Sequence, residues 1–412
     1  MLAWSPGTRN RDVTGDVVVL PALADSAAFR AWLPSVRGKF VLVSAPQPSC
    51  RPDDNWEKWA LPETLRKQRA LRDSVNRAWQ QRVRATGTAL SLGTGSLGRA
   101  LEDAGAAGVV ASLWSQGWGV QKVFFTRNEK APALDLSCED YGLLFRLAEK
   151  GQAPRLRVRA DAEFTGTVPT FNTVAEIRGS EKPDEYVVLS AHFDSWDAGS
   201  GATDNATGTV TMLEAMRILK QVYPRPKRTI LVGHWTSEEQ GLNGSRAFVE
   251  DHPEVVRGLQ ALFNQDNGTG RIENISAAGL VGAGASLGRW ASLMPPELTR
   301  SIRWSFPGSP SGGGSDNASF ICSGAPAFNL GSGSWDYGTY TWHTNRDTFD
   351  KVSVDDVKMN ATLTAMLAYL ASEDATTTPR DRVVTVGDVN RGTAGAWPAC
   401  AKAVRRWEDF QR

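Results

Sequence analysis

Histidine, cysteine, net charge and long apolar runs are all scarce in this sequence. Only four of its 412 residues are histidine and four are cysteine, and the formal net charge is +1. The near-neutral charge removes the electrostatic case for binding nucleic acid or an anionic membrane. No apolar run is long enough for a membrane span. The remaining composition, 41% hydrophobic and 22% charged, is ordinary for a globular protein.

The cysteines are far apart, at Cys50, Cys138, Cys322 and Cys400. Because none forms a CxxC pair, a cysteine-based zinc site is not expected. One or two disulfides are expected if the protein is exported, and buried or free thiols if it is not. The first seven residues lack the basic and apolar regions of a signal peptide. We therefore expect either a cytoplasmic protein or a mature or truncated chain.

The first part of the chain, residues 1–167, is predicted to be a small α/β module without concentrated catalytic residues. Short β-rich runs at 16–20 and 39–43 flank a helical stretch at 26–33. Residues near 50–90 are rich in Arg, Lys, Glu, Gln and Trp, which indicates an exposed helical insertion. We interpret its charges as a solvated helix face rather than as a nucleic-acid surface.

The second part, residues 168–375, alternates strands with helical patterns. Buried-type strands are predicted at 185–191, 228–235 and 259–264. The alternation predicts an α/β fold with a mostly parallel central sheet flanked by helices. Ligands of such sheets bind at the carboxyl ends of the strands, and the histidine and acidic residues of this chain fall there. Residues 376–412 are predicted to be a polar tail without a clear site.

His192 and Asp194 stand together directly after the first of these strands. A histidine followed two residues later by an aspartate suits a metal ligand whose ring is oriented by a carboxylate. Asp204 lies in a glycine-containing loop before a helix, where it is either a ligand or a helix N-cap. Each signal is weak alone, because a histidine at a strand end is often only hydrogen-bonded to its neighbours.

One pair of glutamates, a further aspartate and a further histidine extend this pattern. Glu238 and Glu239 follow the next strand. Adjacent carboxylates on a loop point in different directions, so one can bind a metal while the other faces a water; a solvated acidic turn is the alternative. Asp266 ends the third strand, and His343 lies in a Trp-His-Thr sequence. The weight of the interpretation comes from the set and its order along the chain.

The donor types of this set favour two zinc ions. Three carboxylates, Asp204, Glu239 and Asp266, together with one hydroxide balance the charge of two Zn²⁺. The imidazoles of His192 and His343 complete a set of nitrogen and oxygen donors that suits zinc. The remaining Glu238 is predicted to be the general base, which takes a proton from water and hands it to the leaving amine.

Four stretches together resemble peptidase family 28, the co-catalytic zinc aminopeptidases and carboxypeptidases. They are HFDSWDAG at 192–199, GATDN at 201–205, WTSEEQG at 235–241 and WHT at 342–344. The first and third are similar to the plasma glutamate carboxypeptidase branch of that family. The resemblance covers roughly residues 170–370, and the four motifs together are highly specific.

The resemblance implies a role for each residue of the set. His192 and Asp266 hold one zinc, Glu239 and His343 hold the other, Asp204 bridges them, Asp194 orients His192 and Glu238 is the general base. It also implies a cis peptide bond after Asp204, and a protease-associated domain in residues 1–167. A further stretch, SDNASF at 315–320, is similar to a late-strand family motif, which makes Asp316 a residue beside the site at most.

One feature departs from the family pattern, because almost nothing precedes the predicted protease-associated domain. We expect a catalytic domain at 168–375 that lacks its N-terminal helices, and an export signal in the missing part. A different arrangement of the domain is the alternative. By the resemblance, the protein is secreted or periplasmic.

The predicted function is a zinc-dependent exopeptidase that hydrolyses terminal peptide bonds of short peptides, in the first place as an aminopeptidase. A carboxypeptidase or dipeptidase of the plasma glutamate carboxypeptidase type is the alternative, because Arg346 and Asp347 offer both charges for capturing a free terminus. A non-catalytic truncated or receptor-like member is a third interpretation, and the complete ligand set argues against a receptor. The expected partners are a peptide substrate and, in a homodimer, a second copy of the chain.

Overall fold

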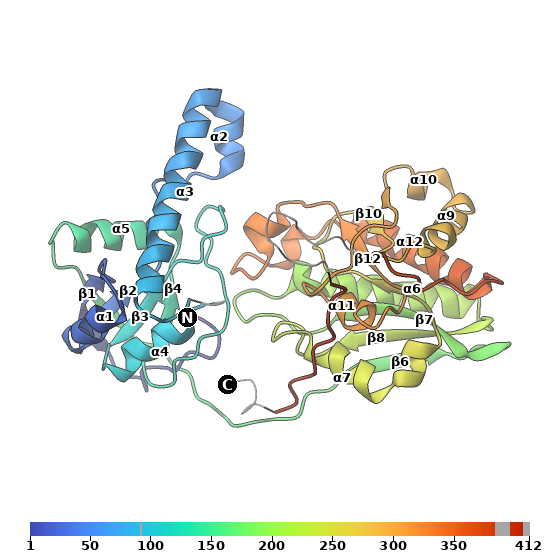
Figure 1. Ribbon diagram of the computed structural model, residues 1–412, viewed down its shortest axis with the longest axis horizontal. Coiled ribbons are helices and arrows are strands. Elements are labelled where there is room, and N and C mark those ends of the chain that lie inside the picture. Colours follow the sequence, from blue (N-terminus) through green and yellow to red (C-terminus); the bar gives the residue numbers. More distant parts are fainter. Residues whose placement is uncertain (91–92, 384–395, 407–412) are drawn as a thin grey trace. The chain divides into compact units, whose positions relative to one another are not determined.

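The computed structural model describes residues 1–90, 93–383 and 396–406, and the chain divides into two compact units (Figure 1). The first unit comprises Met1–Thr167, Trp196–Gly199 and Gly338–Asp347, and the second comprises Val168–Ser195, Ser200–Tyr337 and Thr348–Arg412. Two short segments from the later part of the sequence therefore fold with the first unit. The identity of residues 1–167 as a protease-associated domain stays a prediction.

The first unit is built on a five-stranded sheet in the order β4-β3-β2-β1-β5. Its strands are β1 (Val13–Val19), β2 (Phe40–Leu42), β3 (Gly108–Ala111), β4 (Ala133–Asp135) and β5 (Arg155–Val158). Its shorter helices are α1 (Ser26–Trp32), η1 (Leu33–Val36), α4 (Gly95–Asp103) and α5 (Cys138–Glu149). The first four strands are parallel, and β5 runs antiparallel to β1. Every residue of β2 and β3 is buried, which explains their unbroken apolar sequences.

The charged segment of the first unit forms two helices, α2 (Asp53–Trp59) and α3 (Pro62–Ala85). An ion pair between the buried Arg72 and the partly exposed Asp53 joins them, since Arg72 Nη1 lies 2.7 Å from Asp53 Oδ1. Further along α3, Trp79 donates its indole N–H to the carbonyl of Val43 at 2.8 Å. The long helix is thus anchored by two inward-facing residues while most of its charged side chains are exposed, as the sequence indicated.

The second unit is built on a seven-stranded sheet in the order β11-β10-β12-β9-β7-β8-β6. Its strands are β6 (Thr173–Ile177), β7 (Lys182–His192), β8 (Arg228–Trp235), β9 (Leu259–Asn264), β10 (Ile272–Ser276), β11 (Arg303–Ser305) and β12 (Ala327–Ser332). The four central strands, β12, β9, β7 and β8, are all parallel to one another. The predicted α/β fold with a mostly parallel sheet is confirmed.

Helices cover both faces of this sheet (Figure 1). They are α6 (Thr207–Val222), α7 (Asn243–Asp251), α8 (Pro253–Arg257), α9 (Ala283–Ser292), α10 (Pro296–Thr299), α11 (Asn317–Ile321) and α12 (Val354–Glu373). Shorter turns of this unit are η2 (Ala202–Ala206) and η4 (Phe349–Lys351), whereas η3 (Tyr337–Thr341) belongs to the first unit from Gly338 onward. The helices α6 and α12 pack together and against β7 and β8. Trp235 of β8 instead packs against Phe248 of α7 and Phe320 of α11, so α7 and α11 share the face that Trp235 points to.

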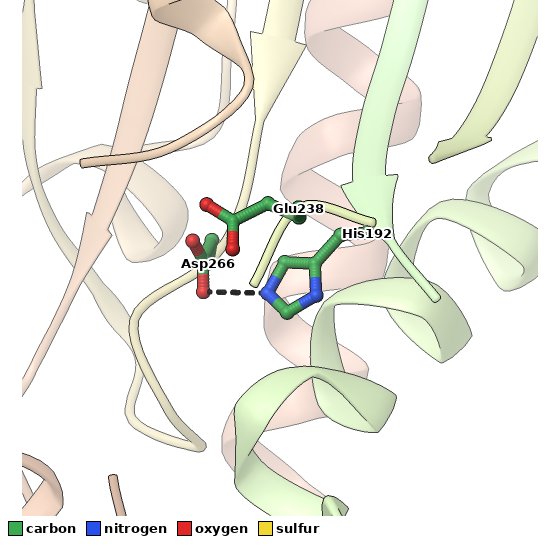
Figure 2. Close-up of side chains that lie close together, drawn as sticks. All are labelled: His192, Glu238 and Asp266. Carbon is green, nitrogen blue, oxygen red and sulfur yellow. Dashed lines mark hydrogen bonds and ion pairs between the residues drawn. The ribbon is translucent and has the colours of Figure 1, made fainter. Parts of the chain in front are cut away.

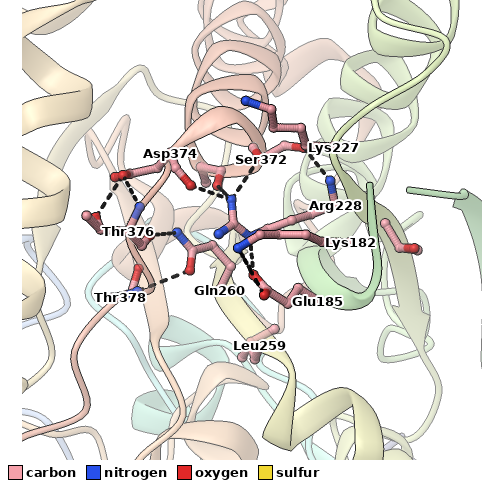
Figure 3. Close-up of polar contacts among 12 residues, drawn as sticks. Lys182, Glu185, Lys227, Arg228, Leu259, Gln260, Ser372, Asp374, Thr376 and Thr378 are labelled. Carbon is pink, nitrogen blue, oxygen red and sulfur yellow. Dashed lines mark hydrogen bonds and ion pairs between the residues drawn. The ribbon is translucent and has the colours of Figure 1, made fainter. Parts of the chain in front are cut away.

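A polar network fixes the end of α12 at the amino end of β8 (Figure 3). Arg228, the first residue of β8, is fully buried. Its Nε donates to Glu185 at 2.7 Å, and its Nη1 donates to the carbonyls of Ser372 and Asp374 at 2.8 and 2.6 Å. The last carbonyls of a helix have no partner within the helix, and Arg228 supplies one.

All four cysteines are disulfide-bonded. Cys50 pairs with Cys138 in the first unit, and Cys322 pairs with Cys400 in the second. The alternative of buried or free thiols is therefore wrong. Within the part of the chain that the structure describes, no helix has the length and apolarity needed to cross a membrane.

Candidate metal centre

The predicted site residues of the second unit follow three neighbouring parallel strands. His192 is the last residue of β7, Glu238 comes shortly after β8, and Asp266 comes shortly after β9. The strands β8, β7 and β9 are adjacent in the sheet and parallel. Their carboxyl ends therefore meet at one edge, where ligands of such sheets bind.

His192, Glu238 and Asp266 lie close together at this edge (Figure 2). His192 Nε2 lies 3.2 Å from Asp266 Oδ1 and 3.3 Å from Asp204 Oδ1. His192 and Asp204 are only 1% and 2% exposed. Burial lowers the pKa of His192, but the carboxylates of Asp266, Asp194 and Asp204 outweigh it and hold that pKa well above its usual value. The centre thus concentrates negative charge that a cation would balance.

Asp204 is placed by the loop that precedes α6. Gly201, with a φ of 63°, makes the turn into η2, and the peptide bond between Asp204 and Asn205 is cis, as the family resemblance implied. Asn205 Nδ2 donates to the carbonyl of Gln265 at 2.9 Å, which joins this loop to the one that carries Asp266. The N-cap of α6 is Ala206, so the alternative interpretation of Asp204 as the helix N-cap is wrong.

Asp194 holds the loop that carries the two glutamates. Its Oδ1 accepts the backbone N–H of Glu238 at 3.1 Å, and its Oδ2 accepts that of Glu239 at 3.2 Å. The same residue faces His192, because its carbonyl oxygen lies 2.9 Å and its Oδ1 3.7 Å from Nδ1. Asp194 therefore fixes the imidazole and the loop together, although the carbonyl is the closer partner of the ring.

Glu238 is not a solvated acidic residue. Burial raises its pKa well above the usual value, with further contributions from Asp266 and Asp316, against the opposing effect of His192. A carboxylate with a raised pKa is suited to accept and return a proton near neutral pH. The choice between a general base and a plain acidic turn at Glu238 stays a prediction.

Donor atoms converge in two overlapping groups of three among the described residues. The first group is His192, Glu238 and Asp266, and the second is His192, Asp204 and Glu239. Within each group the donor atoms lie within 4.8 Å of one another. Imidazole nitrogen and carboxylate oxygen in a buried cluster are the donors that zinc takes in proteins. The residues present therefore fit a metal centre.

Two further residues lie beside the centre. Tyr337 was not among the residues predicted from the sequence, and Asp316 was predicted to lie beside the site at most. The hydroxyl of Tyr337 hydrogen-bonds to Asp204, and burial together with Asp204 and Asp266 raises the pKa of Tyr337 well above its usual value. Asp316 is fully buried at the start of α11, and burial raises its pKa to about 7. The motif of Asp316 thus lies at a helix start rather than on a strand. Nothing in the local sequence of Tyr337 indicated its place.

His343 belongs to the first unit by its contacts. Its ring centroid lies 4.2 Å from that of Trp342 and 4.7 Å from that of Phe124, and its carbonyl accepts the backbone N–H of Val123 at 2.7 Å. Its φ of 57° is in the left-handed region. The role of His343 as a metal ligand stays a prediction.

Comparison with known proteins identifies a matching family. Residues 172–368 match the model of "Peptidase family M28". Carboxypeptidase Q of Mus musculus is 29% identical over 270 residues, which cover 65% of this chain and 56% of that protein. The chain thus spans about half the length of the curated relatives it matches.

Solved structures share the fold. A peptidase M28 precursor from Shewanella amazonensis superposes with a TM-score of 0.66 at 22% identity, covering 92% of this chain and 78% of the other. The zinc aminopeptidase BSAP from Bacillus subtilis superposes with a TM-score of 0.52 at 21% identity, covering 92% and 80%. At these identities the likeness concerns the α/β fold.

Proposed function

We propose that the chain is a zinc-dependent exopeptidase of peptidase family M28, whose model matches residues 172–368, and that it removes terminal residues from short peptides. The observation that carries the proposal is the pair of donor groups that share His192 at the carboxyl edge of the sheet. Zinc is proposed because the donors are nitrogen and oxygen atoms and because BSAP, which shares the fold, is a zinc aminopeptidase.

Two zinc ions per chain are proposed, and each ligand is assigned to an ion as the family resemblance implies. His192 and Asp266 would hold one ion, Glu239 and His343 would hold the other, and Asp204 would be a ligand of both. When bound, the ions act as Lewis acids that polarise the scissile carbonyl and lower the pKa of water. Support for this assignment comes from the convergence of His192 with Asp266 and of Asp204 with Glu239, although both groups contain His192 and the first also contains Glu238.

Glu238 is proposed as the general base. Its carboxylate takes a proton from the attacking water and passes it to the nitrogen of the leaving amine, so that the peptide bond is replaced by a carboxylate and a free amine. Asp194 holds the backbone of Glu238 and Glu239, so both carboxylates keep a defined direction toward the centre. The hydroxyl of Tyr337 hydrogen-bonds to Asp204.

Aminopeptidase action is the first proposal, and carboxypeptidase or dipeptidase action is the second. Carboxypeptidase Q relatives favour the second, whereas the fold shared with BSAP is compatible with the first. Peptides blocked separately at the amino or the carboxyl end distinguish the two, because only a block at the recognised end abolishes cleavage.

Export from the cytosol is part of the proposal. Two disulfides in one chain are typical of proteins that fold in an oxidising compartment, because cytosolic thiols are kept reduced. The proposed partner is a peptide, and homodimer formation stays a prediction. Mass spectrometry of the natural protein under thiol-blocking conditions tests the two disulfides.

The function is tested by metal analysis and a panel of short peptides. Wild type is expected to bind two zinc ions and cleave one end of the peptides. Glu238→Gln should keep the zinc and lose more than about 100-fold in kcat, since general base catalysis contributes that much. Glu254→Gln, an exposed glutamate at 52% side-chain accessibility, is the matched control and should retain full activity. Less than one zinc per chain, or full activity in Glu238→Gln, would overturn the proposal.

A further inference from the structure

Residues 396–406 form an extended segment that crosses two helices next to the candidate metal centre. Cys400 is disulfide-bonded to Cys322 at the end of α11, and Trp397 donates its indole N–H to the carbonyl of Ile321 at 2.9 Å. On α7, Arg405 pairs with Asp251 at 2.8 Å. We refer to residues 396–406 as the strap.

One contact links the strap to the first residue of α7. The backbone N–H of Val404 donates to Asn243 Oδ1 at 2.9 Å. Asn243 in turn donates its Nδ2 to the carbonyl of Gln240 at 3.0 Å. Asn243 is a buried side chain, 9% exposed, so these bonds form away from most solvent. The side-chain amide of Asn243 therefore accepts a hydrogen bond from the strap and donates one to the loop that carries Glu238 and Glu239.

The loop between β8 and α7 needs such support, because its backbone conformation is unusual. Ser237, Gly241 and Leu242 have φ values of 53°, 105° and 61°, in the region that side-chain-bearing residues rarely adopt. The loop closes on itself, since the N–H groups of Gly241 and Leu242 both donate to the carbonyl of Glu238 at 2.7 and 2.8 Å. Strained backbone persists only where surrounding contacts hold it.

Several contacts hold this loop, including a hydrogen bond from the backbone N–H of Thr236 to Asn172 Oδ1 at 3.1 Å. Asp194 accepts the N–H groups of Glu238 and Glu239 on the side of the metal centre. Asn243 donates a hydrogen bond to the carbonyl of Gln240 and accepts one from the backbone of the strap. The side-chain amide of Asn243 has one carbonyl oxygen and one NH₂ group, so it suits a position between a donor and an acceptor.

We propose that Asn243, held by the strap, is a positioning residue for the loop that carries Glu238 and Glu239. The inference rests on the proposed function, because it assigns the loop to the general base and to a metal ligand. The disulfide between Cys322 and Cys400 ties the strap covalently to α11, and the pairing of Arg405 with Asp251 and Glu250 fixes its far end on α7. Residues far along the chain thereby set the geometry of the catalytic loop.

The proposal is tested with Asn243→Ala and Asn243→Asp. Alanine removes both hydrogen bonds. Aspartate keeps the acceptor for Val404 but places a second carboxylate oxygen against the Gln240 carbonyl. Both variants should lower kcat by about 10- to 100-fold with KM changed less than about twofold, because displacement of a reacting group by about 1 Å has an effect of that size. Lys402→Ala is the matched control, an exposed strap residue outside these contacts, and should match wild type.

Two readouts do not depend on activity. The zinc affinity of both Asn243 variants, measured by competition with a chelator, should fall about 10-fold, as expected when a residue that supports a ligand is removed. Hydrogen exchange of the amides of Gly241 and Leu242 should become faster in the variants than in wild type and Lys402→Ala. Circular dichroism shows whether the variants are folded.

A second route removes the covalent anchor instead. The double variant Cys322→Ser/Cys400→Ser should speed exchange in the same loop, and combining it with Asn243→Ala should add little, because both changes break one chain of contacts. Unchanged exchange, zinc affinity and kcat in folded Asn243→Ala would overturn the positioning role. An inactive wild type that nevertheless shows the exchange and zinc effects would overturn the proposed function and leave the positioning role standing.

Discussion

The carboxylate of Asp194 accepts the backbone N–H of Glu239 at 3.2 Å, while the same residue lies against the imidazole of His192. This relationship joins two strand ends that are separated by 43 residues in the sequence, from His192 at the end of β7 to Trp235 at the end of β8. One side chain therefore orients a candidate ligand from each strand end. Such supporting residues matter almost as much as the ligands in metal sites.

Asp194→Asn should weaken zinc binding by about 10- to 100-fold. An amide has a single acceptor oxygen, so one of the two loop N–H groups would face an NH₂ group instead of an oxygen. Zinc affinity is measured by competition with a chelator of known strength. Asp184→Asn, the same change at an exposed position at the start of β7, should leave the affinity unchanged. Equal affinities in the two variants would show that Asp194 does not hold the site.

Tyr337→Phe should lower kcat by about 10- to 100-fold, which corresponds to the loss of one hydrogen bond to a charged group, about 1.5 to 3 kcal/mol. A tyrosine hydroxyl is protonated at neutral pH, and the pKa of Tyr337 is raised further, so this hydroxyl donates to Asp204. Steady-state kinetics on a short peptide measures the effect. Tyr369→Phe, at an exposed position on α12, serves as the control, and a loss of the same size there would contradict the prediction.

Arg228→Met should lower the free energy of unfolding of the second unit by about 3 to 5 kcal/mol. Methionine fills a similar volume, but Glu185 loses its buried partner and the carbonyls at the end of α12 lose their donor (Figure 3). Urea unfolding in the presence of a chelator measures the change without a contribution from zinc. The exposed pair of Arg217 with Glu214 offers the contrast, since Arg217→Met should change stability by less than about 1 kcal/mol.

The contribution of Asp374 to the free energy of unfolding should be lost at low pH. Burial opposes ionisation, but hydrogen bonds from Thr376, Arg289 and Trp290 lower the pKa of Asp374 to about 2. A lowered pKa in the folded state means that the stabilisation is complete above the unfolded pKa of about 4 and is lost as the pH falls toward 2. Wild type should exceed Asp374→Asn by about 1 to 2 kcal/mol at pH 6 and by almost nothing at pH 2. A difference that is constant over this range in urea unfolding would refute the assignment.

The sequence predicted much of the second unit, because its signals are local. Apolar runs predicted the strands at 228–235 and 259–264, and the structure has β8 and β9 at the same residues. Since the carboxyl ends of adjacent parallel strands meet, the positions of His192 and Asp266 after their strands were enough to expect their proximity, and Nε2 and Oδ1 lie 3.2 Å apart. The five short elements from β10 to α11 carried no comparable pattern and were not predicted.

Other parts of the site could not be read from local sequence. The carboxylate of Asp194 was expected beside His192, yet its hydrogen bonds go to the backbone of Glu238 and Glu239. Tyr337 reaches Asp204 from a segment 133 residues further along the chain. Such partners depend on how distant segments of the chain pack together. Neither the periodicity nor the spacing of residues in the sequence predicts that packing.

The sequence by itself determined the α/β class of the fold and the chemistry of the candidate ligands, because strand patterns and donor types are properties of local residues. The tertiary structure decided which loops those residues share. It placed the segment of His343 with the first unit and joined Cys50 to Cys138. It also placed the strap across α7, where Val404 meets Asn243. These contacts join residues far apart in the chain, and only the packing of the whole fold brings such residues together.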